Sequence, residues 1–340
     1  MKITRREFLK TSTKIAVGSF TSPLMGSSPL LYGMEEKSSV IIVSHIQVTK
    51  GLSDVNLNAI KLMLEKALIE FTGEKTLPEA WSKCLPQLQS KDTVGIKINS
   101  TGYCPSRPEL ISVIIDGLIG IGIKETNILI FDHREENMKK HRYWDSIKYD
   151  VQYMGTNQLD FDNRARASIE SQGKKVPLTK IITQLCKYII NVPVLKDHII
   201  SGLSFSLKNA YGYIPLFWKT HMEDRSLTWA MHKKDAAAQI AELNANPVIR
   251  EKTRLIIGDC LLCILDKGPL GLPQWAGNRL IIGKDSVAVD HIALKLLNNA
   301  RAEKGLREVT SRAGHIHHAA RLGVGTNDDN KIELKRIDLS

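Results

Sequence analysis

Short apolar runs rich in β-branched residues alternate along the chain with longer segments whose apolar residues recur at helical spacing. Nearly continuous apolar runs are typical of strands covered on both faces, so they predict strands at 40–43, 93–98, 127–131, 188–192, 255–257 and 280–282. The segments between them predict helices at 56–71, 108–121, 235–243 and 286–297. This alternation indicates an α/β fold with a largely parallel sheet and helices on both faces.

The second predicted helix begins with a capping signal. The sequence Ser106-Arg107-Pro108-Glu109 fits a capping box, in which Ser106 caps the helix and Glu109 returns a hydrogen bond to it. Proline is tolerated in a first helical turn. Residues 133–180 differ, because charged patches replace long apolar runs. We expect this polar stretch to form an excursion over the sheet.

Length and composition suit one large domain. The chain has 340 residues, and its apolar content of 43% is enough to build a substantial core. We expect a single α/β domain over residues 35–330, followed by a C-terminal tail at 331–340. The formal net charge of +11 favours an anionic partner. The sequence has no long basic run and no basic stripe with interleaved aromatic residues, so we do not expect that partner to be nucleic acid.

The first residues carry a targeting signal. The segment Thr4-Arg5-Arg6-Glu7-Phe8-Leu9-Lys10 resembles the twin-arginine export motif, and a moderately apolar stretch follows at 15–31. Prolines interrupt that stretch, which falls short of the about 20 apolar residues of a stable membrane span. Residues 1–34 are therefore expected to be a signal segment and linker that the twin-arginine translocase recognises. We expect a periplasmic or otherwise exported protein with no membrane span, and the cleavage site stays open.

Five cysteines, at positions 84, 104, 186, 260 and 263, are too few for a disulfide-dense scaffold. Cys260 and Cys263 have the C-x-x-C spacing, but they lie in an apolar run that looks like a buried strand. Residues three apart in a regular strand face opposite sides. We therefore expect two buried side chains rather than a redox pair, and whether they pair stays open.

A lysine at the end of the second predicted strand is a candidate for anion binding. Lys97 lies between Ile96 and Ile98 and precedes Asn99, from which the chain leads to the helix at 108–121. The free amides and positive dipole end of a helix favour negative charge, so together with Lys97 they would form an anion pocket. A solvated lysine at the sheet edge is the alternative of equal weight.

A second polar cluster follows the predicted strand at 188–192. Pro193 cannot donate to a central ladder, so we expect the strand to end there and to leave Lys196 and His198 in a loop. His198 would exchange protons or bind a metal, or be an ordinary loop histidine.

The next segment, 201–211, contains Lys208 and Asn209. It fits a helix that ends at Gly212, and it also fits a strand with alternating apolar residues. The two alternatives stay open.

Two further side chains complete the candidates. His221 lies in a segment rich in polar and aromatic residues, and Asp259 is expected to end a strand before the turn at 267–271. An acid at that place would contact a metal or a hydroxyl group, or cap the turn. The histidine spacings match no zinc signature, so no metal ligand set is assigned.

Several of these segments, taken in order, resemble the domain-of-unknown-function 362 family in its twin-arginine-exported form. The resemblance extends from about residue 40 to 325. It rests on the blocks 94–99, 107–110, 189–198, 207–212, 284–290 and 319–325, together with Asp259 before Gly268-Pro269. The family has no assigned reaction. Some similar proteins carry a ferredoxin-like module with clustered cysteines, but no cysteine follows Cys263 here, so an intrinsic iron–sulfur cluster is not expected.

The motif positions coincide with the polar loops and together give one candidate site. Its candidate catalytic residues are His198 and His221, and its candidate ligand-binding residues are Lys97, Asn99, Lys196, Lys208, Asn209 and Asp259. Three lysines in one pocket would repel one another without a counter-charge, so we expect an anionic small ligand or cofactor of unknown identity, with a redox association left open. Two other hypotheses remain: a non-catalytic binding protein of the cell envelope, and a metal-dependent enzyme that uses His198, His221 and Asp259.

Overall fold

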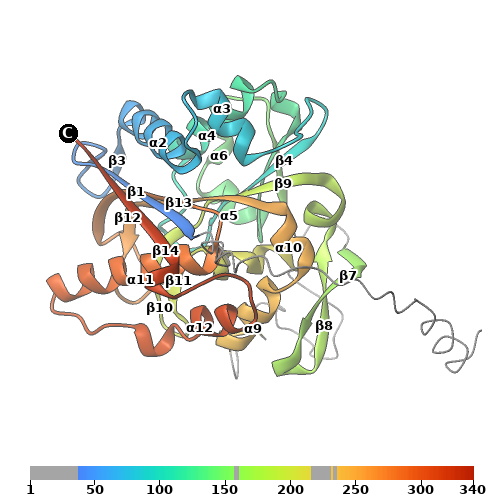
Figure 1. Ribbon diagram of the computed structural model, residues 1–340, viewed down its shortest axis with the longest axis vertical. Helices are drawn as coiled ribbons and strands as arrows, with labels where there is room; N and C mark the ends of the chain where they lie inside the picture. The colour runs from blue at the N-terminus through green and yellow to red at the C-terminus, as the bar shows by residue number, and fades with distance from the viewer. Residues whose placement is uncertain (1–36, 157–160, 216–230, 233–235) are drawn as a thin grey trace, which may run out of the picture. The chain divides into compact units, whose positions relative to one another are not determined.

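The computed structural model describes residues 37–156, 161–215, 231–232 and 236–340, and within them a ten-stranded sheet forms the centre of the fold (Figure 1). Its order is β14-β1-β13-β12-β9-β4-β5-β6, and β10 pairs with both β12 and β11. The strands of this sheet are β1 (Ser38–His45), β4 (Thr93–Lys97), β5 (Ile128–Asp132), β6 (Gln152–Gly155), β9 (Cys186–Asn191), β10 (Val194–His198), β11 (Gly202–Ser204), β12 (Thr253–Ile264), β13 (Trp275–Gly283) and β14 (Ile332–Leu339).

Most neighbouring strands of the sheet run in the same direction. The pairs β12–β9, β9–β4, β4–β5 and β5–β6 are parallel, and so is the pair β1–β14. Strand β13 runs antiparallel to both of its neighbours, β1 and β12. The fold class is therefore α/β with a largely parallel sheet, as the alternation of apolar runs predicts.

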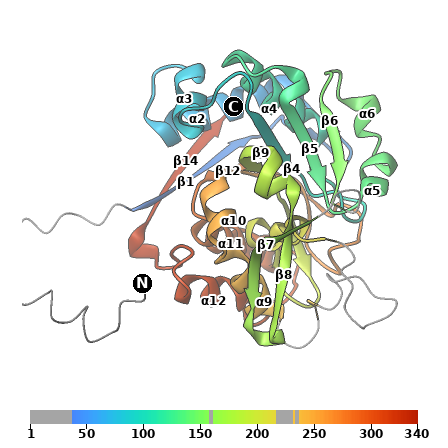
Figure 2. The ribbon, with the colours of Figure 1, turned by 90° about the vertical axis from the view of Figure 1, so that its right-hand side faces the viewer.

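Helices cover both faces of the sheet (Figures 1 and 2). The helices on one face are α2 (Leu57–Thr72), α3 (Leu77–Cys84) and α4 (Pro108–Gly120), and those against the other face are α9 (Ala236–Asn244), α10 (Pro247–Lys252), α11 (Ser286–Glu303) and α12 (His315–Arg321). Alternating residues of β1 serve the two layers, because Ile41 and Val43 pack with the first group and Val40 and Ile42 with the second. None of the described helices is long and apolar enough to cross a membrane.

The start of α4 differs from the predicted capping box. Arg107 is the N-cap residue and its side chain makes no cap hydrogen bond. The Ser106 hydroxyl instead donates to the Val192 carbonyl at 2.7 Å, and it accepts from the Asn99 amide at 2.8 Å. Because these two bonds occupy Ser106, the prediction of a cap at this residue is wrong. A capping box does occur at α3, between Thr76 and Glu79.

Two placements after the central strands also differ from expectation. Lys196 and His198 lie in strand β10 rather than in a loop, because the chain resumes pairing directly after Pro193. Asp259 lies within the long strand β12 rather than at its end. Its carboxylate accepts hydrogen bonds from the backbone amides of Arg107, at 2.8 Å, and of Leu261, at 3.0 Å.

Two segments whose structure the sequence left open, 201–211 and 133–180, form short helices and strands. Residues 201–211 hold both a short strand, β11, and a short helix, α7 (Ser206–Asn209). The excursion at 133–180 contains α5 (Glu135–Lys140), α6 (Tyr143–Ser146), the edge strand β6, and a hairpin of β7 (Phe161–Ile169) and β8 (Lys174–Thr179). A second small hairpin joins β2 (Thr49–Lys50) to β3 (Asp54–Val55).

A bulge in β12 brings two cysteines to one side of the strand. The register of β12 against β13 shifts between Cys260 and Leu262, so the regular alternation is broken there. Cys260 and Cys263 consequently share one apolar cluster, where both are free thiols with no exposed surface. Burial and the neighbouring Cys260 thiol raise the pKa of Cys263 well above its usual range. The expectation of opposite faces is wrong at this position, whereas both thiols are buried as expected.

The last residues of the chain belong to the sheet. Residues 332–339, which the sequence suggested as part of a tail, form strand β14 and pair along the whole length of β1. Residues Glu36–Ser340 form one compact unit.

Candidate functional site

The candidate site lies where three parallel strands end side by side. Strands β9, β4 and β5 are neighbours in the sheet, yet the chain runs from β4 to β5 on one side and returns later to β9 on the other. Such a reversal leaves a crevice beyond the carboxyl ends of the strands, where ligands of α/β proteins bind. Here a pocket of about 730 Å³, called the site pocket below, is lined by residues from the ends of β4 and β5, from β10 and β11, and from α7.

A buried ion pair lines the site pocket. Lys97, at the end of β4, and Asp132, at the end of β5, are 1% and 4% exposed, and the Lys97 ammonium lies 2.7 Å from Asp132 Oδ1. Burial by itself raises the pKa of Asp132, but Lys97 and two hydrogen bonds from Ser100 outweigh this effect and lower it below its usual value. The Asp132 carboxylate is therefore the internal counter-charge of Lys97.

The remaining protons of Lys97 are also engaged. Its ammonium donates to the Ile98 carbonyl at 2.6 Å and to Asn209 Oδ1 at 3.0 Å. An ammonium group has three protons, so Lys97 has none left for a ligand. The α carbon of Gly212 lies so close that an added Cβ would stand 2.0 Å from Lys97 Cε, so only glycine leaves room for this lysine.

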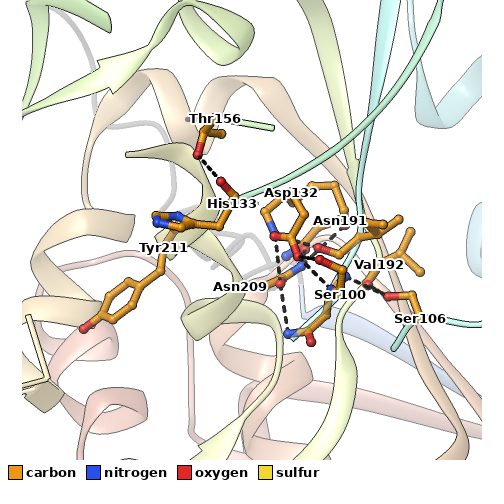
Figure 3. A network of polar contacts seen from close by, with 12 residues as sticks. Ser100, Ser106, Asp132, His133, Thr156, Asn191, Val192, Asn209 and Tyr211 are labelled. Atoms are coloured by element: carbon orange, nitrogen blue, oxygen red, sulfur yellow. Dashed lines mark hydrogen bonds and ion pairs between the residues drawn. The ribbon is translucent and has the colours of Figure 1, made fainter. Parts of the chain in front are cut away.

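Amide side chains connect the strand ends to helix α7 (Figure 3). Asn209 Nδ2 donates to Asn191 Oδ1 at 2.7 Å, and Asn191 in turn donates to the Ser206 carbonyl and hydroxyl. Asn99 Nδ2 contacts Asn209 Oδ1 at 3.4 Å. This network fixes the orientation of α7 relative to the strand ends, and with it the position of Lys208.

Lys196 lies behind the wall of the site pocket. It is fully buried, and its ammonium donates to Asn99 Oδ1 and to the Thr101 carbonyl, each at 2.8 Å. Both Asn99 and Thr101 line the site pocket, whereas Lys196 itself does not. Burial lowers the pKa of Lys196 to about 8, and nearby Cys104 and Asp132 partly oppose this shift. No carboxylate of the described residues forms an ion pair with it.

Lys208 lines the site pocket directly. Its amine lies 2.9 Å from Nε2 of His232 and 4.8 Å from the centre of the Tyr211 ring. Burial, followed by the positive charges of Lys196 and Lys97, lowers the pKa of Lys208 to about 7. The charges of the three lysines therefore influence one another, although Lys97 and Lys208 line the site pocket and Lys196 lies behind its wall.

His198 is a buried, neutral imidazole. Its Nδ1 accepts from the backbone amides of Ile200 and Ser201, each at 3.2 Å, so its proton resides on Nε2. The ring stacks on His232 with centroids 5.3 Å apart. Burial and the positive charge of Lys208 lower the pKa of His198 to about 2. At neutral pH, His198 is suited to donate a hydrogen bond from Nε2 rather than to release a proton.

A buried carboxylate of α11 supports helix α7, and the two helices pack in the same apolar cluster. Asp290 of α11 accepts from the backbone amides of Ser206, at 2.7 Å, and Leu207, at 3.1 Å. Nε2 of His315 lies 3.7 Å from this carboxylate, and both side chains are fully buried. Asp290 therefore anchors the first turn of α7, which carries Lys208 and Asn209.

The structure brings most of the predicted site residues together. Lys97, Asn99, His198, Lys208 and Asn209 line the site pocket, and Lys196 lies directly behind it. Asp259 is not among the lining residues; it binds the backbone at the start of α4. His221 lies outside the described residues.

Sequence reasoning missed Asp132, His232 and Asp290. Asp132 follows a buried strand next to the strand of Lys97, and that adjacency of strand ends is the signal that could have found it. Asp290 lies at a buried position of an amphipathic helix, which is unusual for an acid without a partner. His232 follows His221 in the same polar and aromatic segment, but the spacing of the two histidines matches no zinc signature and gave His232 no assigned role.

The pocket also has a charged and an apolar rim. Arg134 and Lys140 are exposed at its mouth, and so are Ile199 and Leu270, which are 68% and 60% exposed. The described residues contain no group of three or more side chains placed to bind a metal ion. Chemically, the arrangement offers a positive interior with one amine, one imidazole N–H and a fixed ion pair.

Comparisons with known proteins give a family but no reaction. No curated protein matches the chain. A crystal structure of a protein from Thermotoga maritima matches at 15% identity and a TM-score of 0.38, over 68% of this chain and 58% of that one. A family model described as "Domain of unknown function (DUF362)" matches residues 94–295, which include every described residue proposed for the site from the sequence. More than half of the chain is covered by this model, and the protein therefore belongs to the DUF362 family.

Proposed function

We propose that this protein binds a small anionic ligand in the site pocket, with the Lys208 ammonium as its direct contact. The observation that carries the proposal is the imbalance of charge among the described residues. Lys97 is paired with Asp132, whereas Lys196 and Lys208 form no ion pair with a described carboxylate, although the charge of Asp259 partly opposes the lowering of the pKa of Lys196. An anion would supply the missing counter-charge.

The available hydrogen-bond donors support the same assignment. All three protons of Lys97 are engaged, whereas the one described polar contact of the Lys208 amine is His232. His198 adds an N–H from Nε2, because its Nδ1 is an acceptor. Lys97 and Asp132 thus build the wall of the site pocket, and Lys208 and His198 face the ligand.

Sulfate titration by calorimetry tests this proposal, because the charge of sulfate is constant between pH 6 and 9. We expect Lys208→Met to weaken sulfate binding by about tenfold or more, since a hydrogen bond to a charged group contributes about 1.5–3 kcal/mol. Lys208→Arg keeps the charge and should retain binding. Lys66→Met removes an exposed charge on α2, over the other face of the sheet, and is the matched control.

The pH dependence has a definite sign. The pKa of Lys208 is lowered to about 7 in the free protein, and an anion stabilises its protonated form. Sulfate binding therefore takes up a proton and weakens as the pH rises from 6 to 9. Equal affinity in the wild type and in Lys208→Met, or an affinity independent of pH over this range, would contradict the proposal.

We also propose that the protein acts outside the cytoplasm after export through the twin-arginine pathway. The support is the Thr4-Arg5-Arg6-Glu7-Phe8-Leu9-Lys10 segment and the apolar stretch after it. Subcellular fractionation tests this proposal.

A further inference from the structure

Lys208 differs from the other two lysines of the site in what its amine contacts. Lys97 is held by a carboxylate and two oxygen acceptors, and Lys196 by two oxygen acceptors. The amine of Lys208 instead lies 2.9 Å from a ring nitrogen of His232, over the face of Tyr211, on the wall of a pocket. A carbonyl compound that enters the site pocket therefore meets this nitrogen.

We propose that Lys208 is a nucleophilic amine that forms an imine with the carbonyl group of an anionic aldehyde or ketone, of which 2-oxo acids are the simplest class. The inference rests on the proposed function, because the carboxylate of such a compound is the anion that the site pocket would hold.

The surroundings of Lys208 leave its amine uncharged in a substantial fraction of the molecules at neutral pH. Among the described residues, the charged and titratable groups that face it are Lys97 from β4, Lys196 and His198 from β10, Tyr211 and His232, while Asp132 of β5 forms an ion pair with Lys97. Burial and the two lysines lower the pKa of Lys208 to about 7. A neutral amine is the form that attacks a carbonyl carbon, and a lysine desolvated beside other cations is a known means of obtaining it.

The chemistry balances without a further reactant. The lone pair of the Lys208 nitrogen forms a bond to the carbonyl carbon, and the carbonyl π electrons move to the oxygen. One amine proton passes through Nε2 of His232 to that oxygen and gives a carbinolamine. The second amine proton follows, the C–O bond breaks, and the oxygen leaves as water while nitrogen and carbon form the imine double bond. Nothing is oxidised or reduced in this step.

The pocket provides the other requirements of the reaction. Its volume of about 730 Å³ is ample for a compound with a few carbon atoms. Lys196 adds positive potential behind Asn99, where the carboxylate of a 2-oxo acid would lie, and Nε2 of His198 offers a hydrogen bond. Exposed Ile199 and Leu270 at the rim suit an apolar substituent on the carbonyl compound.

Reductive trapping tests this inference. The full-length protein is incubated with pyruvate and sodium cyanoborohydride at pH 7, and the reduced adduct is located by peptide mass spectrometry. We expect labelling at Lys208 to exceed that at exposed lysines by at least about tenfold, because an ordinary lysine has only roughly one neutral amine per thousand or fewer at this pH. Lys208→Arg should abolish this adduct. Lys66→Arg, at an exposed lysine of α2 over the other face of the sheet, should leave it unchanged.

The outcomes separate this inference from the proposed function. If Lys208→Arg and the wild type bind sulfate equally while pyruvate labels Lys208 no more than exposed lysines, imine formation is wrong and anion binding stands. If acetone, which has no charge, labels Lys208 as well as pyruvate does and sulfate does not bind, the amine is nucleophilic but the site is not specific for anions. Circular dichroism of each variant shows whether it has folded.

Discussion

The residues of the site fall into those that hold it together and those that face its interior. Lys97, the residue that the sequence marked first, belongs to the former group because its three protons bind Ile98, Asp132 and Asn209. Lys208 belongs to the latter group. A lysine at a strand end is thus a poor guide to ligand contact until the partners of its ammonium are known.

Asp132→Asn is expected to destabilise the fold strongly. The substitution leaves the Lys97 ammonium, which is 1% exposed, without its carboxylate, and breaking a buried pair from one side costs about 3–5 kcal/mol. Urea unfolding measures this loss. Adding Lys97→Met to Asp132→Asn removes the orphaned charge and should recover part of the stability.

A matched surface pair provides the control for this measurement. Glu70 and Lys335 lie 2.9 Å apart with both side chains 43% exposed, so Glu70→Gln should cost less than about 1 kcal/mol. A loss in Asp132→Asn no larger than that in Glu70→Gln would show that the buried pair does not support the site.

At the scale of elements, short segments are positioned by groups distant in sequence. Helix α7 has only four residues and no side-chain cap of its own. Such a helix is not stable by itself. Asp290, on α11, accepts its first two free amides and takes the place of the missing cap.

Asp290→Ala is therefore expected to lower stability by about 2 kcal/mol and to weaken sulfate binding through Lys208, because two buried amides lose their acceptor. Urea unfolding and calorimetry give the two readouts. Asp328→Ala removes a cap from an exposed turn, where Asp328 accepts from Asn330 at 3.0 Å, and should leave sulfate binding unchanged. Unaltered sulfate affinity in Asp290→Ala would mean that α7 keeps its position without this anchor.

The long apolar elements could be predicted from the sequence, and the short polar ones could not. Strands β4, β5 and β9 and helices α2 and α4 follow the periodicity within a few residues, because strands that are buried on both faces form continuous apolar runs. Helix α11 begins at the predicted residue but ends at Glu303 rather than at 297. Strands β6, β7 and β14 are polar or half-exposed and leave none. The hairpin formed by β7 and β8 therefore looked like an irregular excursion.

The candidate site was predictable in outline, since Lys97, Asn99, His198, Lys208 and Asn209 do line one pocket. What the sequence could not give was the partner of each group. Ser106 resembled a helix cap but binds Val192, and the carboxylate of Asp259 binds the backbone of Arg107. Such choices depend on contacts between residues 86 and 152 positions apart in the chain, which no local pattern records.

At the scale of the whole molecule, the proposed export concerns the segment that precedes the α/β unit. Replacing Arg5 and Arg6 together by lysine should leave the protein in the cytoplasm, because the pathway recognises the arginine pair. Lys14→Gln changes a basic residue after the motif and should leave export unaffected. Fractionation and immunoblotting report the location. Equal export of the double lysine variant and the wild type would contradict a twin-arginine signal.

The position of β1 in the sheet has a consequence for how the protein is made. Both of its neighbours, β13 and β14, come from the end of the chain, and residues 332–339 pair along the full length of β1. During translation, the apolar segment around Ile41 therefore has no strand to pair with until synthesis of the chain is nearly finished. Chaperones that bind nascent chains would have to protect this segment longest. A premature stop codon before β14 would release a polypeptide in which β1 is an unpaired edge strand.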